Sequence, residues 1–155
     1  MKPKAKSKPS AKPGLHFHHL LVPTDLTERT EKALQVADKL AVSDKARITI
    51  VHVIETIDGL QFDELKPFYE RLEQKARTAM TRLARSVPKG VAQVESAVVY
   101  GKRAEEIVKY ASANDVDLVV LASHRVNPSS TVNHDWGTIS YKVGILAQCP
   151  VLLVK

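Results

Sequence analysis

The sequence is poor in cysteine and in aromatic residues, and each shortage excludes a class of site. A single cysteine, Cys149, among 155 residues rules out an intrachain disulfide framework and a cysteine-built zinc site. Aromatic side chains make up only 5% of the residues, which argues against a stacking platform for single-stranded nucleic acid. No run of about 18 apolar residues occurs, so we expect no membrane insertion.

Acidic residues are missing from the first 14 positions, where basic charge is concentrated. These positions hold five lysines: Lys2, Lys4, Lys6, Lys8 and Lys12. The other 141 residues carry 18 basic and 17 acidic side chains, so they contribute only +1 to the formal net charge of +6. A basic body would indicate a nucleic-acid-binding face, and this one is close to neutral. We therefore expect no specific nucleic-acid binding.

Residues 1–15 are predicted to form a disordered basic tail, and residues 16–155 to form one domain. The tail has three prolines and few apolar side chains, so it cannot bury enough surface to offset its ordering entropy. It lacks the apolar stretch of a secretory signal. Two interpretations of the tail stay open, a solubilising leader and an electrostatic handle for an anionic partner.

Short apolar runs alternate with segments of helical periodicity along the rest of the chain. The predicted strands span residues 18–24, 46–54, 91–100, 117–122 and 150–154, and the predicted helices span 27–42, 63–87, 103–113 and 137–147. Thr27 is the expected N-cap of the first helix, and Pro67 predicts an irregular start to the second. This alternation predicts an α/β fold with a three-layer, doubly wound, parallel sheet of five strands.

In such a sheet, ligands bind at the carboxyl ends of the strands where the strand order reverses. Two segments are candidates for that place. One is Pro23-Thr24-Asp25 after the first strand, and the other is Ala122-Ser123-His124-Arg125 after the fourth strand, together with Gly137-Thr138 at a helix start. A helix start with free amides is a ready anion site. Asp25 can accept hydrogen bonds from an adenine amino group or a ribose hydroxyl, or it can simply organise the turn.

Four collinear segments carry a resemblance to a known family. They read LLVPTDLTERTEKAL, ITIVHVIE, VVYGKRAEEIVKYASANDVDLVVLASH and WGTISYKVGILAQCPVLLVK. From about residue 17 to 155, the chain resembles the universal stress protein family. The resemblance implies strand order 3-2-1-4-5 in a Rossmann-like fold of the adenine-nucleotide-binding type. It also implies a homodimer through the terminal strand Val151–Val154 and a regulatory role in the cytoplasmic stress response.

One branch of that family binds ATP or AMP through Gly-x-x-Gly, nine residues, and then Gly followed by Ser or Thr. This chain departs from that pattern. Ala122 and Arg125 stand in place of the first two glycines, and eleven residues separate Arg125 from Gly137. Gly137-Thr138 matches the end of the motif. Arg125 must either leave the cleft, fill it, or compensate by binding phosphate through its guanidinium group.

The resemblance therefore implies an adenine and ribose half-site more than a triphosphate site. Pro23, Thr24 and Asp25 match the first-loop motif of the family, and Val53 matches the apolar residue against the adenine ring. The expected ligand is ATP or AMP, with Mg²⁺ needed only for a triphosphate. We expect no catalytic residues and at most weak ATP hydrolysis. The alternative function is a dimeric interaction module of the same fold that binds no nucleotide.

Histidines and the cysteine are the remaining candidates for chemistry. His16, His18 and His19 lie close together, but no carboxylate or thiol neighbours them in the sequence. We expect them to be partly exposed residues at a strand start, and we predict no metal site. His52 lies inside an apolar strand and is expected to be hydrogen-bonded there. Cys149 follows a helix carboxyl end, which disfavours a thiolate, so we expect a packing residue.

Overall fold

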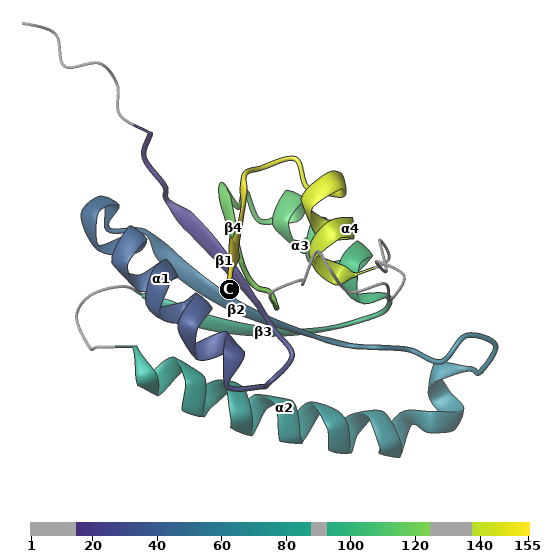
Figure 1. Cartoon of the computed structure of the whole chain (residues 1–155). Coiled ribbons are helices and arrows are strands. Elements are labelled where there is room, and N and C mark those ends of the chain that lie inside the picture. Colours follow the sequence, from purple (N-terminus) through teal and green to yellow (C-terminus); the bar gives the residue numbers. More distant parts are fainter. Residues whose placement is uncertain (1–14, 88–92, 125–137) are drawn as a thin grey trace, which may run out of the picture.

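The computed structural model describes residues 15–87, 93–124 and 138–155. Within these ranges, five parallel strands form one sheet in the order β3-β2-β1-β4-β5 (Figure 1). The strands are β1 (His19–Thr24), β2 (Arg47–Ile54), β3 (Val94–Tyr100), β4 (Leu118–Ala122) and β5 (Val151–Val154). The predicted fold class and strand order are confirmed.

Helices cover both faces of the sheet, as the apolar strands require. The helices are α1 (Arg29–Asp44), α2 (Lys66–Ser86), α3 (Arg103–Ala113) and α4 (Ile139–Leu146), with a short 3-10 helix η1 (Phe62–Leu65) before α2. Helices α1 and α2 pack on one face, and α3 and α4 pack on the other (Figure 1).

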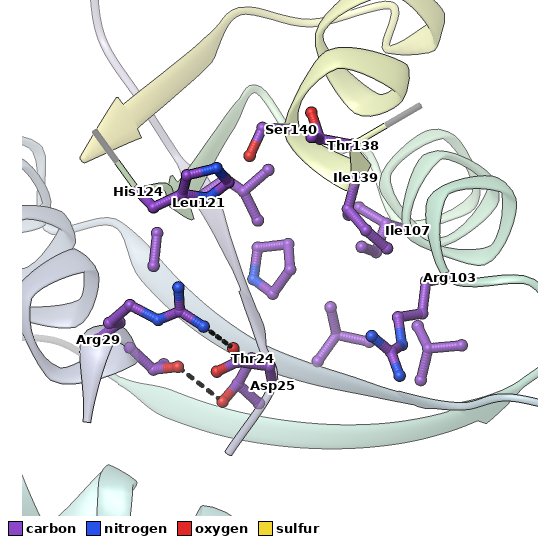
Figure 2. Close-up of a pocket in the computed structure, with 15 residues that line it drawn as sticks. Thr24, Asp25, Arg29, Arg103, Ile107, Leu121, His124, Thr138, Ile139 and Ser140 are labelled. Carbon is purple, nitrogen blue, oxygen red and sulfur yellow. Dashed lines mark hydrogen bonds and ion pairs between the residues drawn. The ribbon is translucent and has the colours of Figure 1, made fainter. Parts of the chain in front are cut away.

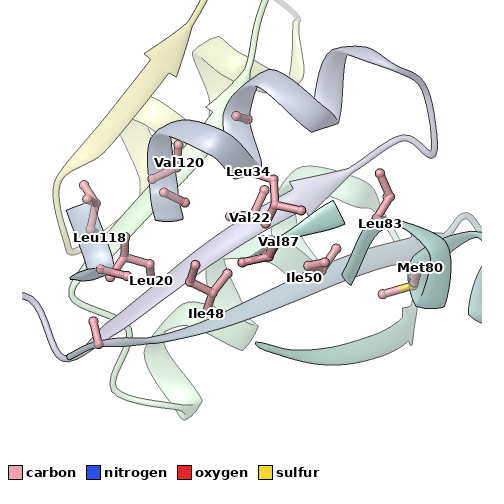
Figure 3. Packing of buried hydrophobic residues seen from close by; sticks show 14 residues of the cluster. Leu20, Val22, Leu34, Ile48, Ile50, Met80, Leu83, Val87, Leu118 and Val120 are labelled. Carbon is pink, nitrogen blue, oxygen red and sulfur yellow. The ribbon is translucent and has the colours of Figure 1, made fainter. Parts of the chain in front are cut away.

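The two faces hold separate apolar cores, because successive side chains of a strand point to opposite faces. Leu20 and Val22 of β1 lie under α1 and α2 with Met80, as Figure 3 shows. Leu21, between them in the sequence, belongs to the core under α3 and α4. Each core is fully shielded at its centre, so the sheet is a rigid platform for the loops at its ends.

The start of α1 differs from the sequence prediction. Helix α1 begins at Arg29, and Glu28 occupies the N-cap position without a side-chain hydrogen bond. The prediction of Thr27 as N-cap is wrong, because both the amide and the hydroxyl of Thr27 donate to Asp25 instead. Pro67 lies in the first turn of α2, which follows η1, so the predicted irregular start of this helix is confirmed.

Strand β5 pairs with β4 alone and forms one edge of the sheet. Leu152 and Leu153 of β5 are 37% and 40% exposed. The predicted disordered tail, the start of the predicted strand at residue 91, and the loop that contains Arg125 and Gly137 fall outside the described residues. None of the helices in the described ranges has both the length and the apolar character needed to cross a membrane.

Candidate functional site

A pocket of about 300 Å³ opens at the carboxyl ends of β1, β2 and β4. Helix α4 begins at its rim, and the first turns of α1 and α3 border it (Figure 2). This is the place that the reversal of strand order at β1 and β4 predicts for a ligand.

The structure brings both candidate segments to this pocket. Seven of the predicted site residues line it: Pro23, Thr24, Asp25, Val53, Ala122, His124 and Thr138. Ser123 does not line the pocket, but its hydroxyl group lies 3.4 Å from that of the lining residue Ser140. Arg125 and Gly137, the two remaining predicted residues, lie outside the described part of the chain.

Asp25 directly follows β1, and its carboxylate organises the turn into α1. One carboxylate oxygen accepts hydrogen bonds from the amide and the hydroxyl of Thr27, at 3.0 and 2.5 Å. The other accepts from the guanidinium group of Arg29 at 3.0 Å. The turn-organising role considered for Asp25 is therefore present, and it holds the carboxylate at the rim of the pocket.

The charge state of Asp25 follows from these contacts. Partial burial by itself raises the pKa of Asp25, but the hydrogen bonds from Thr27 and the positive charge of Arg29 outweigh it, so the pKa is lowered from its ordinary value. The pocket therefore keeps a carboxylate anion at neutral pH. Such a group accepts hydrogen bonds and cannot donate one.

Backbone strain and buried hydroxyls fix the β1–α1 loop beside Asp25. The hydroxyl groups of Thr24 and Thr30 hydrogen-bond at 2.9 Å, and the amide of Leu26 donates to the Thr24 hydroxyl. Leu26 has a φ of 64°, a left-handed conformation that costs a non-glycine residue roughly 1 kcal/mol or more. His52 donates from Nδ1 to the Thr24 carbonyl at 2.9 Å, so the expected hydrogen bonding of His52 is confirmed.

Two arginines that the sequence analysis did not select also line the pocket. Figure 2 shows Arg29 and Arg103 on opposite sides of it. Each has a carboxylate partner, Asp25 for Arg29 and Glu55 for Arg103 at 2.8 Å. Arg103 opens the helix after β3, and all the strands end at the same edge of the sheet. That position is the signal that could have identified it.

The rim formed by β4 and α4 supplies hydroxyl groups and a helix start. Thr138 caps α4 and accepts a hydrogen bond from the amide of Tyr141 at 3.3 Å. Ser140 lies in the first turn of the helix and lines the pocket. Lys155 lies close by and donates to the Ser123 hydroxyl at 3.2 Å and to the His124 carbonyl at 3.0 Å. The amides of a first helical turn and a nearby cation favour an anionic group.

Apolar side chains form the interior of the pocket. They come from the face of β2 and β4 that α3 and α4 cover, and from these two helices: Val51, Val53, Leu121, Ile107 and Ile139. Val53 is 5% exposed, so the predicted adenine-facing residue lies deep rather than at the rim. An apolar interior, with polar groups placed at the rim, is typical of sites for small organic ligands.

His16, His18 and His19 lie at the opposite end of the sheet. His19 is 3% exposed; its Nδ1 donates to the Asn114 carbonyl at 2.9 Å and its Nε2 accepts from the Thr49 hydroxyl at 2.8 Å. The expectation of a partly exposed residue is thus wrong for His19, because β1 lies in the centre of the sheet. His16 is exposed and pairs with Asp44 at 2.9 Å.

Neither a metal site nor a reactive thiol emerges elsewhere in the described residues. No group of three or more histidine, cysteine or carboxylate side chains is placed to hold a metal ion in those ranges. Cys149 packs against the core under α3 and α4, and burial raises the pKa of its thiol. It is the packing residue that the sequence predicts.

Comparisons with known proteins agree with this fold. The model of the universal stress protein family matches residues 16–155. The universal stress protein YxiE of Bacillus subtilis is 29% identical over 150 residues, which cover 90% of this chain and 99% of that relative. The universal stress protein UspA from Lactobacillus plantarum has the same fold, with a TM-score of 0.73 at 22% identity, over 92% of this chain and all of that chain.

Two further solved structures with this fold carry adenine nucleotides. A universal stress protein in complex with cAMP has a TM-score of 0.66 at 20% identity, over 91% of this chain and 99% of that one. The universal stress protein from Archaeoglobus fulgidus in complex with dAMP has a TM-score of 0.66 at 17% identity, over 91% of this chain and all of that one. At these identities the likeness concerns the fold.

Proposed function

This chain belongs to the universal stress protein family, and we propose that it is a regulatory member that binds an adenine mononucleotide in the pocket between β1, β4 and α4. The observation that supports this most is the chemistry of the pocket. Its interior is apolar, a carboxylate stands at one side, and two arginines and the start of α4 stand around the rim. These groups fit, in turn, a base, a ribose and a phosphate.

In the proposed complex, the base packs on Val53 and Val51, and the Asp25 carboxylate accepts hydrogen bonds from the ribose hydroxyls. The phosphate lies near the first turn of α4, where Ser140 offers its hydroxyl and the helix presents the positive end of its dipole. The cAMP and dAMP complexes with the same fold support an adenine nucleotide as the ligand class.

The size and the charges of the pocket favour AMP over ATP. A volume of about 300 Å³ is at the small end of the range for ligand pockets. Magnesium, which a triphosphate requires, prefers carboxylate oxygens and water. Among the described lining residues, Asp25 is the only carboxylate, and Thr27 and Arg29 already hydrogen-bond to it. The described residues do not fit a magnesium site, so we propose a monophosphate without metal.

We further propose that the protein acts in the cytoplasm as a homodimer through β5. The exposed Leu152 and Leu153 lie on an edge strand, and Ile145 and Leu146 of α4 are also exposed. An unpaired apolar edge favours aggregation unless another chain covers it, and a two-fold axis through β5 satisfies both copies. The same face favours the second candidate function, a dimeric interaction module that binds no nucleotide.

Thermal unfolding with AMP, ATP and GMP separates the two candidates. A ligand at a hundredfold excess over its Kd stabilises a one-site protein by about 2.7 kcal/mol, a shift of several degrees for a domain of this size. We expect a larger shift with AMP than with ATP, and none with GMP. Absence of a shift with every nucleotide, confirmed by calorimetric titration, would reject the nucleotide proposal and leave the interaction module.

A further inference from the structure

Helix α2 carries a row of cations on its solvent face. Arg71, Lys75, Arg82 and Arg85 are all exposed. At 100° per residue, these four side chains fall within an arc of about 80°. The buried residues of the helix, Tyr69, Ala76, Met80 and Leu83, lie on the opposite side against the sheet. The four cations therefore form one straight row, which we call the α2 basic row.

The cations of this row have no carboxylate partner among the residues that the structure describes. Arg77, on the flank of the same helix, differs because it pairs with Glu73 at 2.6 Å. An unpaired cation gives up only its hydration when an external anion binds, whereas a paired one must also break its salt bridge. The row is thus available to an external anion.

Charge is segregated along this part of the chain. Residues 71–86 hold five basic and one acidic side chain, a net charge of +4. Residues 55–70 hold five acidic and one basic side chain, a net charge of −4. These two blocks cancel in the total, which is why the body is close to neutral by composition. The near-neutral sum conceals a basic surface on the carboxyl-terminal part of α2.

The carboxyl-terminal end of α2 lies at the same end of the sheet as the start of β1. All five strands are parallel, so β1 and β3 begin at one end. The described chain enters β1 from Leu15, and α2 finishes at Ser86, shortly before β3. Figure 1 shows the start of β1 and the carboxyl-terminal end of α2 at the same end of the molecule. The pocket lies at the other end.

The chemistry of the row fits a phosphodiester backbone. From Arg71 to Arg85 the helix rises about 21 Å at 1.5 Å per residue, which is about six base pairs at 3.4 Å. The exposed side chains between and beside the cations are polar: Gln74, Thr78 and Thr81. A membrane-bound helix would bring apolar groups to this region, whereas the exposed Leu60, Phe62 and Phe68 lie at the opposite, acidic end.

We propose that the α2 basic row binds the phosphate backbone of nucleic acid without sequence selectivity. The row presents cations and uncharged polar side chains, so its contacts to phosphates are electrostatic. Its affinity falls steeply with salt, because each neutralised phosphate releases condensed counterions. Binding is independent of AMP, since the row lines no part of the pocket.

A labelled 20-base-pair DNA duplex tests this by fluorescence anisotropy over a series of salt concentrations. The test variant is Arg82→Gln/Arg85→Gln in the full-length chain. The matched control is Lys39→Gln/Lys142→Gln, which removes the same charge from exposed positions on α1 and α4. All four residues are exposed, so circular dichroism and the melting temperature should match those of the parent in both variants.

We expect the test variant to bind about tenfold or more weakly at about 50 mM salt. The slope of log affinity against log salt should decrease by about two, one for each lost phosphate contact. The control should retain the parent slope.

Two results would overturn the proposal. One is equal affinity and slope in the test variant and the control, because the tail alone or net charge would then account for binding. The other is tighter binding of the parent to vesicles of phosphatidylserine and phosphatidylcholine than to the duplex, with loss of vesicle binding in the test variant. The row would then face a lipid surface.

Discussion

At the amino end of β1, the polar side chains hydrogen-bond to one another, whereas at its carboxyl end they surround a pocket. His19 opens the strand and is held by Thr49 and Asn114. Thr24 closes the strand and, with Asp25, borders a space of about 300 Å³. One strand of six residues therefore connects a closed polar network to an open one.

Hydrogen bonds at the amino end of β1 hold the chain in place where it enters the sheet. The Asp117 carboxylate accepts from the amides of His18 and His19 at 2.8 and 3.2 Å, and Asp44 accepts from the amide of Phe17 at 2.7 Å. Carboxylates from the end of α1 and from the loop before β4 thus replace the strand partners that these amides lack. The comparison indicates that the amino end serves stability and the carboxyl end serves binding.

The largest expected effect on stability comes from opening the closed end. Asp117→Ala leaves the amides of His18 and His19 without their acceptor and should lower the free energy of unfolding by about 1.5–3 kcal/mol, the range for hydrogen bonds to charged groups. Urea denaturation measures the change. Asp58→Ala, at a largely exposed carboxylate, is the control and should change it by less than about 0.5 kcal/mol. Unchanged stability in Asp117→Ala would remove the distinction between the ends.

At the open end, we expect a substitution to change AMP binding strongly and the free energy of unfolding only slightly. Arg103→Gln should weaken AMP binding by about tenfold, because it removes a cation at the rim of the proposed phosphate site. The exposed pair that Arg103 forms with Glu55 contributes little to stability, so the unfolding free energy should change by less than about 1 kcal/mol. Calorimetric titration gives the affinity. An unchanged Kd would place the phosphate away from Arg103.

The carboxyl end of the sheet also holds a closed cluster of side chains, around Tyr100. Unlike the pocket, this cluster contributes to stability in a way that depends on pH. Tyr100 ends β3, contacts Phe62 and Tyr69, and donates to Glu73. Burial, followed by the bond and charge of Glu73, raises the pKa of Tyr100 to about 12. A raised pKa means that the contribution of Tyr100 to stability is complete below its ordinary pKa of 10 and is lost between pH 10 and about 12.

Spectrophotometric titration of tyrosinate checks this expectation. One of the four tyrosines should ionise near pH 12, and that late step should vanish in Tyr100→Phe. If all the tyrosines of the native protein ionised near pH 10, the hydrogen bond to Glu73 would not be maintained in solution.

The smallest effect is expected from the tail. Deletion of residues 1–14 should leave the melting temperature within about one or two degrees, because a tail of lysine and proline buries little surface. Differential scanning calorimetry of the full-length and shortened chains measures it. A larger decrease would show that the tail packs on the amino end and contributes to closing it.

The sheet was predictable from the sequence because the strands are buried on both faces and read as apolar runs. The strand order came from the family resemblance, since periodicity alone gives no pairing. The first loop was also predictable, because Thr24 ends a buried strand and Asp25 directly follows it. Their partners Thr30 and Arg29 were not selected, since a hydroxyl and an arginine in a helix have many ordinary surface roles.

Other features depend on which segments meet in space. The burial of His19 follows from the central position of β1, which brings Asn114 beside it from 95 residues away. The α2 basic row is invisible in the net charge because an acidic block of the same size precedes it. Thr27 resembles an N-cap by residue type, but the carboxylate two residues earlier binds its amide and its hydroxyl.

The most direct test of the contrast between the two ends is a titration of ¹⁵N-labelled protein with AMP, followed through the backbone amide resonances. Shifts should concentrate at Asp25, Leu26, Val53 and at Ile139 and Ser140 in the first turn of α4, and they should saturate with one Kd. The amides of His19, Arg47 and Asp117 should stay in place. Shifts that gather at those three residues, or no shifts at all at millimolar AMP, would contradict the assignment of binding to the carboxyl end.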